Sequence, residues 1–191
     1  MKKPTFSAAL SALAICLAVA TTAHAQDTTV PTNDFSVGTE QEVEVGQLQL
    51  VATHGDWAVQ CVKVESGVAP CQIAQQVKDA EGFPIAEVIL FQLPEGSPAV
   101  MGGSIVTPLG TLLTAQLSFG IDGAAAKNYP FNWCENVGCV SRVGFTAEEL
   151  TALQAGQQAV MTIRSINNNQ PITLFLSLKG FTAAYNASLP K

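Results

Sequence analysis

Residues 57–71, WAVQCVKVESGVAPC, decide the fold that the sequence predicts. Apolar side chains recur there at every second position, in Trp57, Val59 and Cys61. That period places them on one face of a β-strand. Ser66-Gly67 follows as a turn signal, because glycine adopts turn conformations at little steric cost. If the turn centres on Ser66, Cys61 and Cys71 lie directly opposite each other on paired strands, so the stretch predicts a β-hairpin.

The same alternation recurs along the rest of the chain. The runs are Phe83, Ile85, Ile89 and Phe91; Leu113, Ala115, Leu117, Phe119 and Ile121; Ala159, Met161 and Ile163; and Ile172, Leu174, Leu176 and Leu178. Turn residues separate them at Glu81-Gly82, Gly102-Gly103, Asp122-Gly123 and Asn167 to Asn169. Short alternating strands between turns are typical of an all-β antiparallel sandwich. The run from Leu113 to Ile121 predicts one strand with one face in the core and the other in water.

Two short helices are expected as connections. Thr146 followed by Glu149 forms a capping box, and Gly156 marks the end of that helix. A second helical turn is expected from Thr182 to Ala187, where alanines favour helix and Pro190 closes the chain.

The first 25 residues predict a cleavable signal peptide. Lys2 and Lys3 are followed by the apolar stretch 6–20 and by the small-x-small pattern at residues 23–25. Lipid attachment at Cys16 is disfavoured because the preceding Ile15 is bulky. We expect a mature chain with no transmembrane segment, located in the periplasm, with the cell surface or secretion as alternatives.

The mature chain divides into two parts by composition. Residues 26–44 are acidic and polar with little to bury, so they predict a flexible tether, and residues 45–191 predict one domain. The alternation of Val43, Val45, Leu48 and Leu50 around Gly46 suggests an opening edge strand. Without residues 1–25 the chain has seven basic and fifteen acidic residues, a net charge of −8 (7 − 15). The basic residues are scattered, which excludes nucleic acid as a partner because phosphate binding requires clustered Lys and Arg.

Four cysteines remain in the mature chain, an even number that favours disulfides in an oxidising compartment. The spacing favours the pairs Cys61 with Cys71 and Cys134 with Cys139. A zinc site or a redox dithiol is the alternative, but neither spacing is the two-residue gap that such motifs usually have.

Several short motifs resemble those of one known family. They are His54-Gly55-Asp56-Trp57, Pro70-Cys71, Pro108-Leu109-Gly110, Phe119 to Gly123, Tyr129-Pro130-Phe131, Gly138-Cys139 and Gly180-Phe181-Thr182-Ala183-Ala184. In this order they resemble the invasion associated locus B family of exported bacterial proteins, over roughly residues 45–189 and including all four mature cysteines. The resemblance implies an immunoglobulin-like β-sandwich, a periplasmic or surface location and an association with host-cell invasion in the pathogens that gave the family its name. It implies no established biochemical activity and no defined catalytic residues.

Candidate catalytic residues are few. His54 is the one histidine of the mature chain, and we interpret it as a turn or strand-entry residue, with catalysis as the alternative. Glu148 and Glu149 are adjacent, but neighbouring side chains diverge on a helix, so Glu149 is expected to cap and Glu148 to be solvated. We expect no catalytic residues, cofactor or metal.

The candidate binding patch is aromatic. Tyr129, Phe131 and Trp133 alternate just before Cys134 and are expected on one strand face, either packed in the core or, where exposed, as a binding platform. The predicted function is a non-enzymatic interaction module of the bacterial envelope, linked to host-cell invasion or envelope maintenance, whose partner is an unknown protein or envelope component. The alternatives are an envelope hydrolase that uses His54 and a periplasmic assembly factor that donates or accepts a strand.

Overall fold

A computed structural model of the chain describes residues 38–39, 42–79 and 81–190. The predicted signal peptide, residues 1–25, lies outside the described residues, and so do residues 26–37 and 40–41 of the predicted tether, residues 26–44. Among the helices that the structure describes, none has the length and apolar character needed to cross a membrane.

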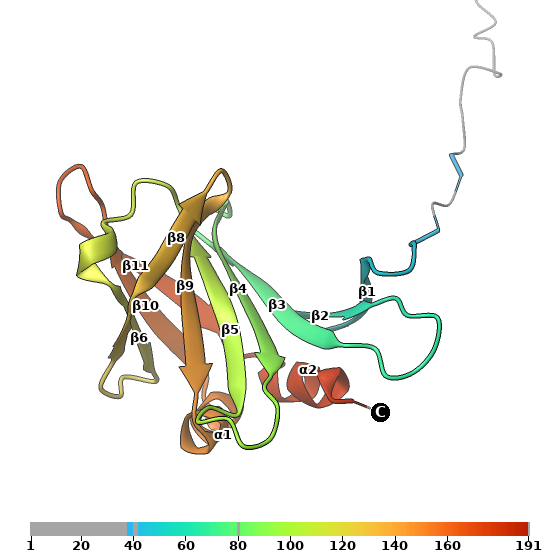
Figure 1. The fold of residues 1–191 in the computed structure, drawn as a ribbon. Coiled ribbons are helices and arrows are strands. Elements are labelled where there is room, and N and C mark those ends of the chain that lie inside the picture. The colour runs from blue at the N-terminus through green and yellow to red at the C-terminus, as the bar shows by residue number, and fades with distance from the viewer. Residues whose placement is uncertain (1–37, 40–41, 80, 191) are drawn as a thin grey trace, which may run out of the picture. The chain divides into compact units, whose positions relative to one another are not determined.

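The described residues form two antiparallel sheets (Figure 1). The larger sheet has the order β1 (Leu48–His54), β2 (Trp57–Val62), β3 (Cys71–Lys78), β4 (Pro84–Gln92), β5 (Met101–Thr107), β9 (Gly138–Phe145) and β8 (Phe131–Glu135). The smaller sheet has the order β11 (Pro171–Ser177), β10 (Gln158–Arg164), β6 (Leu117–Ile121) and β7 (Lys127–Tyr129). This confirms the predicted all-β antiparallel sandwich.

The core lies between the two sheets and follows the predicted alternation along β2 and β10. Along β2, Trp57 and Val59 are fully buried. From the small sheet, Met161 and Leu174 are buried in the same cluster. Each such side chain contributes about 1.5–3 kcal/mol when it leaves water, so this core is the main source of stability.

Both predicted helices are present, at the end of the sandwich where β4 and β9 finish (Figure 1). Helix α1 (Ala147–Ala155) starts with the expected capping box between Thr146 and Glu149 and ends at Gly156. Helix α2 (Phe181–Ser188) packs on β1, β2 and β3, with the Phe181 ring edge-on to Trp57 at a centroid distance of 5.2 Å.

The strand predicted from Leu113 to Ile121 is shorter than expected. Leu113–Ala115 form a 3₁₀ turn, η2, and β6 begins only at Leu117. Gln116 between them has a positive φ of 58° with a ψ of 168°. That conformation breaks the alternation, because it turns the chain between Ala115 and Leu117, which an unbroken strand would keep on one face.

The predicted turn at Gly102-Gly103 is wrong, because both glycines lie inside β5. A Cβ atom on Gly103 would lie 2.2 Å from the carbonyl oxygen of Ile89, so only glycine fits this contact with β4. The chain instead turns between Pro94 and Ser97, where the Ser97 N–H donates to the Pro94 carbonyl at 3.3 Å.

The run predicted from Phe83 to Phe91 lies on the outward face of β4, and the other face points to the core. The buried residues of β4 are Ala86, Val88 and Leu90, whereas Phe83 just before the strand is exposed and Phe91 is half-buried. Both faces of β4 are apolar, so alternation alone does not identify the core side.

Candidate binding surface

Exposed apolar side chains gather along β1 and the segments that flank it. They are Val45 at 55%, Leu48 at 51%, Leu50 at 65%, Val51 at 48% and Val68 at 59% exposure, and we call these five residues the edge surface. Soluble proteins seldom leave grouped apolar side chains in water unless the surface binds something. The edge surface is therefore the first candidate for a binding site.

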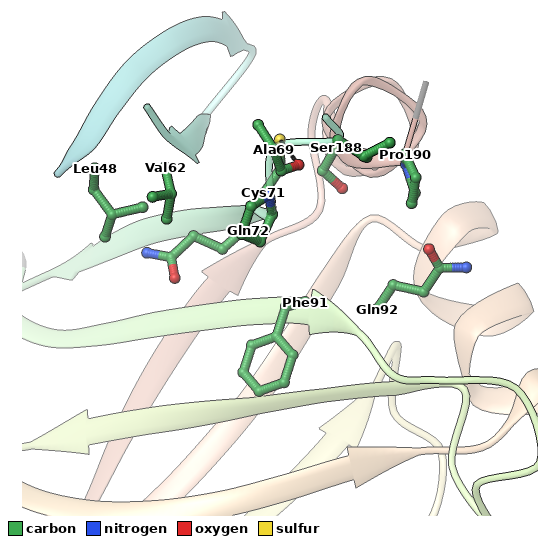
Figure 2. A pocket seen from close by; sticks show the side chains of 11 residues that line it. Leu48, Val62, Ala69, Cys71, Gln72, Phe91, Gln92, Ser188 and Pro190 are labelled. Atoms are coloured by element: carbon green, nitrogen blue, oxygen red, sulfur yellow. Dashed lines mark hydrogen bonds between the residues drawn. The ribbon is translucent and has the colours of Figure 1, made fainter. Parts of the chain in front are cut away.

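A groove of about 400 Å³ opens beside the edge surface (Figure 2). Its lining comes from β1 and β2, from the loop between β2 and β3, from the start of β3, from the end of β4 and from the end of α2. The lining residues are Leu48, Val62, Val68, Ala69, Pro70, Cys71, Gln72, Phe91, Gln92, Ser188 and Pro190. Figure 2 shows the side chains of Leu48 and Val62 next to each other on neighbouring strands. The lining is mostly apolar and carries no charged side chain, so the groove suits an apolar group.

A disulfide positions the loop that forms one wall of the groove. Cys61 and Cys71 lie opposite each other in the β2–β3 register and are joined with an S–S distance of 2.02 Å. The Val62 N–H donates to the Pro70 carbonyl at 2.9 Å, which holds the end of the loop against β2. The bridge joins the pair that the spacing favours.

The second disulfide closes the hairpin of β8 and β9. Cys134 lies opposite Cys139 in the register, and the two are bonded. Within the described ranges, no group of three His, Cys, Asp or Glu side chains is placed to hold a metal ion.

Ser177 on β11 ties the two sheets together at the other end of β2. Its carbonyl accepts from Trp57 Nε1 and from Gln75 Nε2, both at 2.9 Å. Its N–H donates to Gln75 Oε1 at 3.0 Å, and its hydroxyl donates to Asp56 Oδ2 at 2.7 Å. Gln75 is only 7% exposed, so this clamp is a buried polar link between β3 and β11.

Two glycines allow the β1–β2 turn to touch the start of α2. A Cβ on Gly55 would lie 2.4 Å from the Lys179 carbonyl oxygen, and a Cβ on Gly180 would lie 2.1 Å from the His54 carbonyl oxygen. Both glycines have positive φ, 57° and 86°. Backbone therefore packs on backbone here, which no other residue type would permit.

His54 is the last residue of β1 and faces Trp57 across this turn, in line with its interpretation as a turn residue. None of the hydrogen bonds among the described residues involves its ring. The Ser177 hydroxyl donates to Asp56 rather than to a histidine. A serine hydrolase needs the hydroxyl to donate to the histidine base, so these residues do not form that arrangement.

Tyr129, Phe131 and Trp133 do not share one strand face, contrary to the prediction. Tyr129 ends β7 in the small sheet, whereas Phe131 begins β8 in the large sheet. Pro130 lies between them, and a residue without an N–H cannot continue a hydrogen-bonded ladder. Tyr129 is half-buried and packs toward Phe145 with ring centroids 6.3 Å apart.

A second irregularity separates Phe131 from Trp133. The register shifts between them, so that Phe131 lies opposite Ser141 and Trp133 opposite Val140, its immediate neighbour. Since neighbouring residues of a strand point to opposite faces, Phe131 packs against the core while Trp133 points outward, 41% exposed. Trp133 Nε1 donates to Glu135 Oε1 at 2.6 Å. Of the predicted patch, Trp133 is exposed, whereas Tyr129 and Phe131 are partly buried against the core.

Glu149 and Glu148 differ in environment as expected. Glu149 caps α1 and pairs with Lys127, whose ammonium lies 2.7 Å from Oε1, and Glu148 is exposed. Desolvation raises the pKa of Glu149, but hydrogen bonds from Lys127 and Thr146 outweigh it and leave the pKa below its ordinary value. Desolvation, with the nearby Glu149 carboxylate, raises the pKa of Tyr129.

The sequence motifs did not reveal the groove. Val62, Val68 and Phe91 come from separate segments and meet only because α2 and the β2–β3 loop close around the strand ends. The available signals were the alternation around Gly46, which suggests an opening edge strand, and the outward set on β4.

A family model described as "Invasion associated locus B (IalB) protein" matches residues 57–189. The chain belongs to the invasion associated locus B family. Two invasion protein B homologs, from Brucella abortus strain 2308 and from Brucella abortus biovar 1 strain 9-941, are each 30% identical over 139 residues. Those matches cover 73% of this chain and 79% of each homolog.

The crystal structure of invasion associated protein b from Bartonella henselae has the same fold, with a TM-score of 0.64 and 22% identity. The structural match covers 73% of this chain and 96% of the Bartonella chain. For this member of the invasion associated locus B family, the match to the family model begins at residue 57. Strand β1 and four of the edge-surface residues, Val45, Leu48, Leu50 and Val51, therefore precede the matched segment, whereas Val68 lies within it.

Proposed function

We propose that the chain is an exported, non-enzymatic interaction module of the bacterial envelope, which binds a protein partner through the edge surface and its groove. The observation that carries the proposal is the grouping of five exposed apolar side chains beside an uncharged groove. Such a surface loses contact with water on binding, which contributes about 25 cal/mol for each Å² that is buried.

The predicted compartment and chemistry support this function. A signal peptide at residues 1–25 leads to export, and the two disulfides suit an oxidising compartment such as the periplasm. The placement of His54, Ser177 and Asp56 serves to join turns and sheets, which favours binding over hydrolysis. Names of the relatives refer to invasion, so host-cell contact is one setting for the module and envelope maintenance is the other.

Site-specific photocrosslinking in the native cell tests the proposal. A photoreactive residue at Leu50, which is 65% exposed, is compared with one at Ile166, which is 60% exposed in the β10–β11 turn. We expect a discrete protein adduct from Leu50 and none from Ile166, in the full-length protein and in a version without residues 26–44. Equal adducts from both positions, or none from Leu50, would show that the edge surface is not the binding site.

A further inference from the structure

Strand β1 has a free side in the part of the chain that the structure describes, since its one paired neighbour is β2. The Lys63 N–H donates to the Gln47 carbonyl at 2.9 Å, whereas the Val62 N–H donates away from β1, to Pro70. Leu48 lies opposite Val62, so it occupies a non-hydrogen-bonded position. At such a position the N–H and C=O of the outer strand point away from its neighbour, toward the free side.

This free side is less protected than the other sheet edges. Edges are usually blunted by proline, by charge or by irregular pairing. Strand β7 ends beside Pro130, β11 begins with Pro171, and β8 contains a register shift. Strand β1, Leu48–His54, has the sequence LQLVATH, with no acidic residue, Lys, Arg or Pro. Its irregularity lies between Leu50 and Ala52 and leaves the start of the strand regular.

The groove lies on the face where a strand added to β1 would place alternate side chains. Leu48 and Val62 are cross-strand partners and point to the same face, and both line the groove. A further strand would lie about 4.8 Å beyond β1, with every second side chain on that face. Apolar residues at those positions would meet Leu48, which forms the outer rim of the groove, and the intervening residues can be polar.

The charges around the start of β1 favour basic residues at the ends of such a strand. Glu42 and Glu44 precede β1, and Glu65 lies in the loop that carries Val68. Lys63, whose ammonium donates to the Val43 carbonyl at 2.6 Å, adds one positive charge among these three carboxylates, so the local charge stays negative. The chain as a whole has a net charge of −6. A partner with basic flanks is therefore attracted and one with acidic flanks is repelled.

Building on the proposed function, we propose that the edge surface accepts an extended polypeptide segment, which adds to β1 as an extra strand. The segment has alternating apolar residues, which pack on Leu48 and Leu50, and basic residues at its ends. Backbone hydrogen bonds from Leu48 supply part of the binding, and the exposed leucine side chains supply the preference for apolar residues.

A defined peptide tests this mode of binding on the purified mature protein. The probe is a synthetic peptide of alternating Val and Thr, about as long as β1, with lysines at both ends, and the matched control has glutamates there. We expect saturable binding of the lysine peptide by fluorescence anisotropy at low salt, at least about tenfold tighter than the control. Hydrogen exchange should show new protection of the Leu48 amide.

Two substitutions separate strand addition from binding by side chains alone. Leu48→Pro and Leu48→Ala both remove the leucine side chain, but only proline removes the N–H that points to the free side. We expect Leu48→Pro to bind the peptide about tenfold more weakly than Leu48→Ala does, with similar melting temperatures. If Leu48→Pro does not fold, N-methylation of alternate peptide amides gives the same comparison on the wild-type protein. Methylation of the peptide amides that face β1 should abolish binding, and methylation of the intervening amides should not.

The outcomes distinguish this proposal from the broader function. If the peptide binds but neither the proline nor N-methylation matters, strand addition is wrong and side-chain binding at the edge surface stands. If the lysine peptide does not bind, strand addition is wrong, and the Leu50 crosslink then decides the broader function independently. A free protein that sediments as a dimer and dissociates with Leu48→Pro would assign β1 to a second copy of the chain instead.

Discussion

Replacing Gln75 by leucine should destabilise the domain, because Gln75 joins the two sheets. The change removes two hydrogen bonds to Ser177, of 2.9 and 3.0 Å, each contributing about 1 kcal/mol. It also leaves the Ser177 N–H without its partner, while the Ser177 carbonyl keeps its bond from Trp57. Leucine recovers part of the loss through apolar burial at a site that is 7% exposed. We expect a net loss of about 2 kcal/mol in the free energy of unfolding.

The measurement is thermal and urea unfolding followed by circular dichroism. A loss of about 2 kcal/mol lowers the melting temperature by roughly 4–8 °C in a domain of this size. The matched control is Gln76→Leu, the next residue on β3, which is exposed and should change stability by less than about 0.5 kcal/mol. If the two variants melt at the same temperature, the clamp does not hold the sheets together.

Four further predictions concern other parts of the chain. Deleting residues 26–44 should leave the melting temperature unchanged, and a drop of many degrees would make that segment part of the fold. Peptide mapping should show both local disulfides, and Cys61→Ser, with a separation of 10 residues to its partner, should cost about 3 kcal/mol against about 2 for Cys134→Ser, with a separation of 5. Glu149→Gln should lower the free energy of unfolding at neutral pH, because the fold stabilises the ionised form of Glu149 and thereby lowers its pKa. The stability difference from the wild type should vanish as the pH falls through that lowered pKa, and a difference that persists at low pH would contradict this. His54→Ala should remove no hydrolytic activity, and loss of a reproducible activity with an unchanged melt would favour the enzyme alternative.

The sequence predicted those features that depend on neighbouring residues. The hairpin of β2 and β3 follows from local alternation and a glycine turn, and helix α1 follows from the Thr146 cap. Features that depend on distant contacts were missed. Gly103 looked like a turn residue, yet its lack of a side chain serves the close approach of Ile89. In β4 the choice of core face depends on what lies across the sandwich.

The candidate site could be predicted only in part for the same reason. Alternation around Gly46 suggested an opening edge strand, which the structure places at Leu48–His54. The aromatic patch failed as a unit because Pro130 moves the chain from one sheet to the other and a register shift then turns Trp133 away from Phe131. The groove brings together residues as far apart as Leu48 and Pro190, and no local pattern reports such a meeting.

The order of the two disulfides bears on how the chain would mature during the export that we propose. The four cysteines that the structure describes allow three connectivities, and the structure has the one that pairs consecutive cysteines along the chain. During export, Cys61 and Cys71 would pair while the second half of the chain is still crossing the membrane, before Cys134 is available as a competitor. A thiol oxidase that joins cysteines in the order of their arrival would produce these bonds directly, without the exchange step that corrects a wrongly paired disulfide.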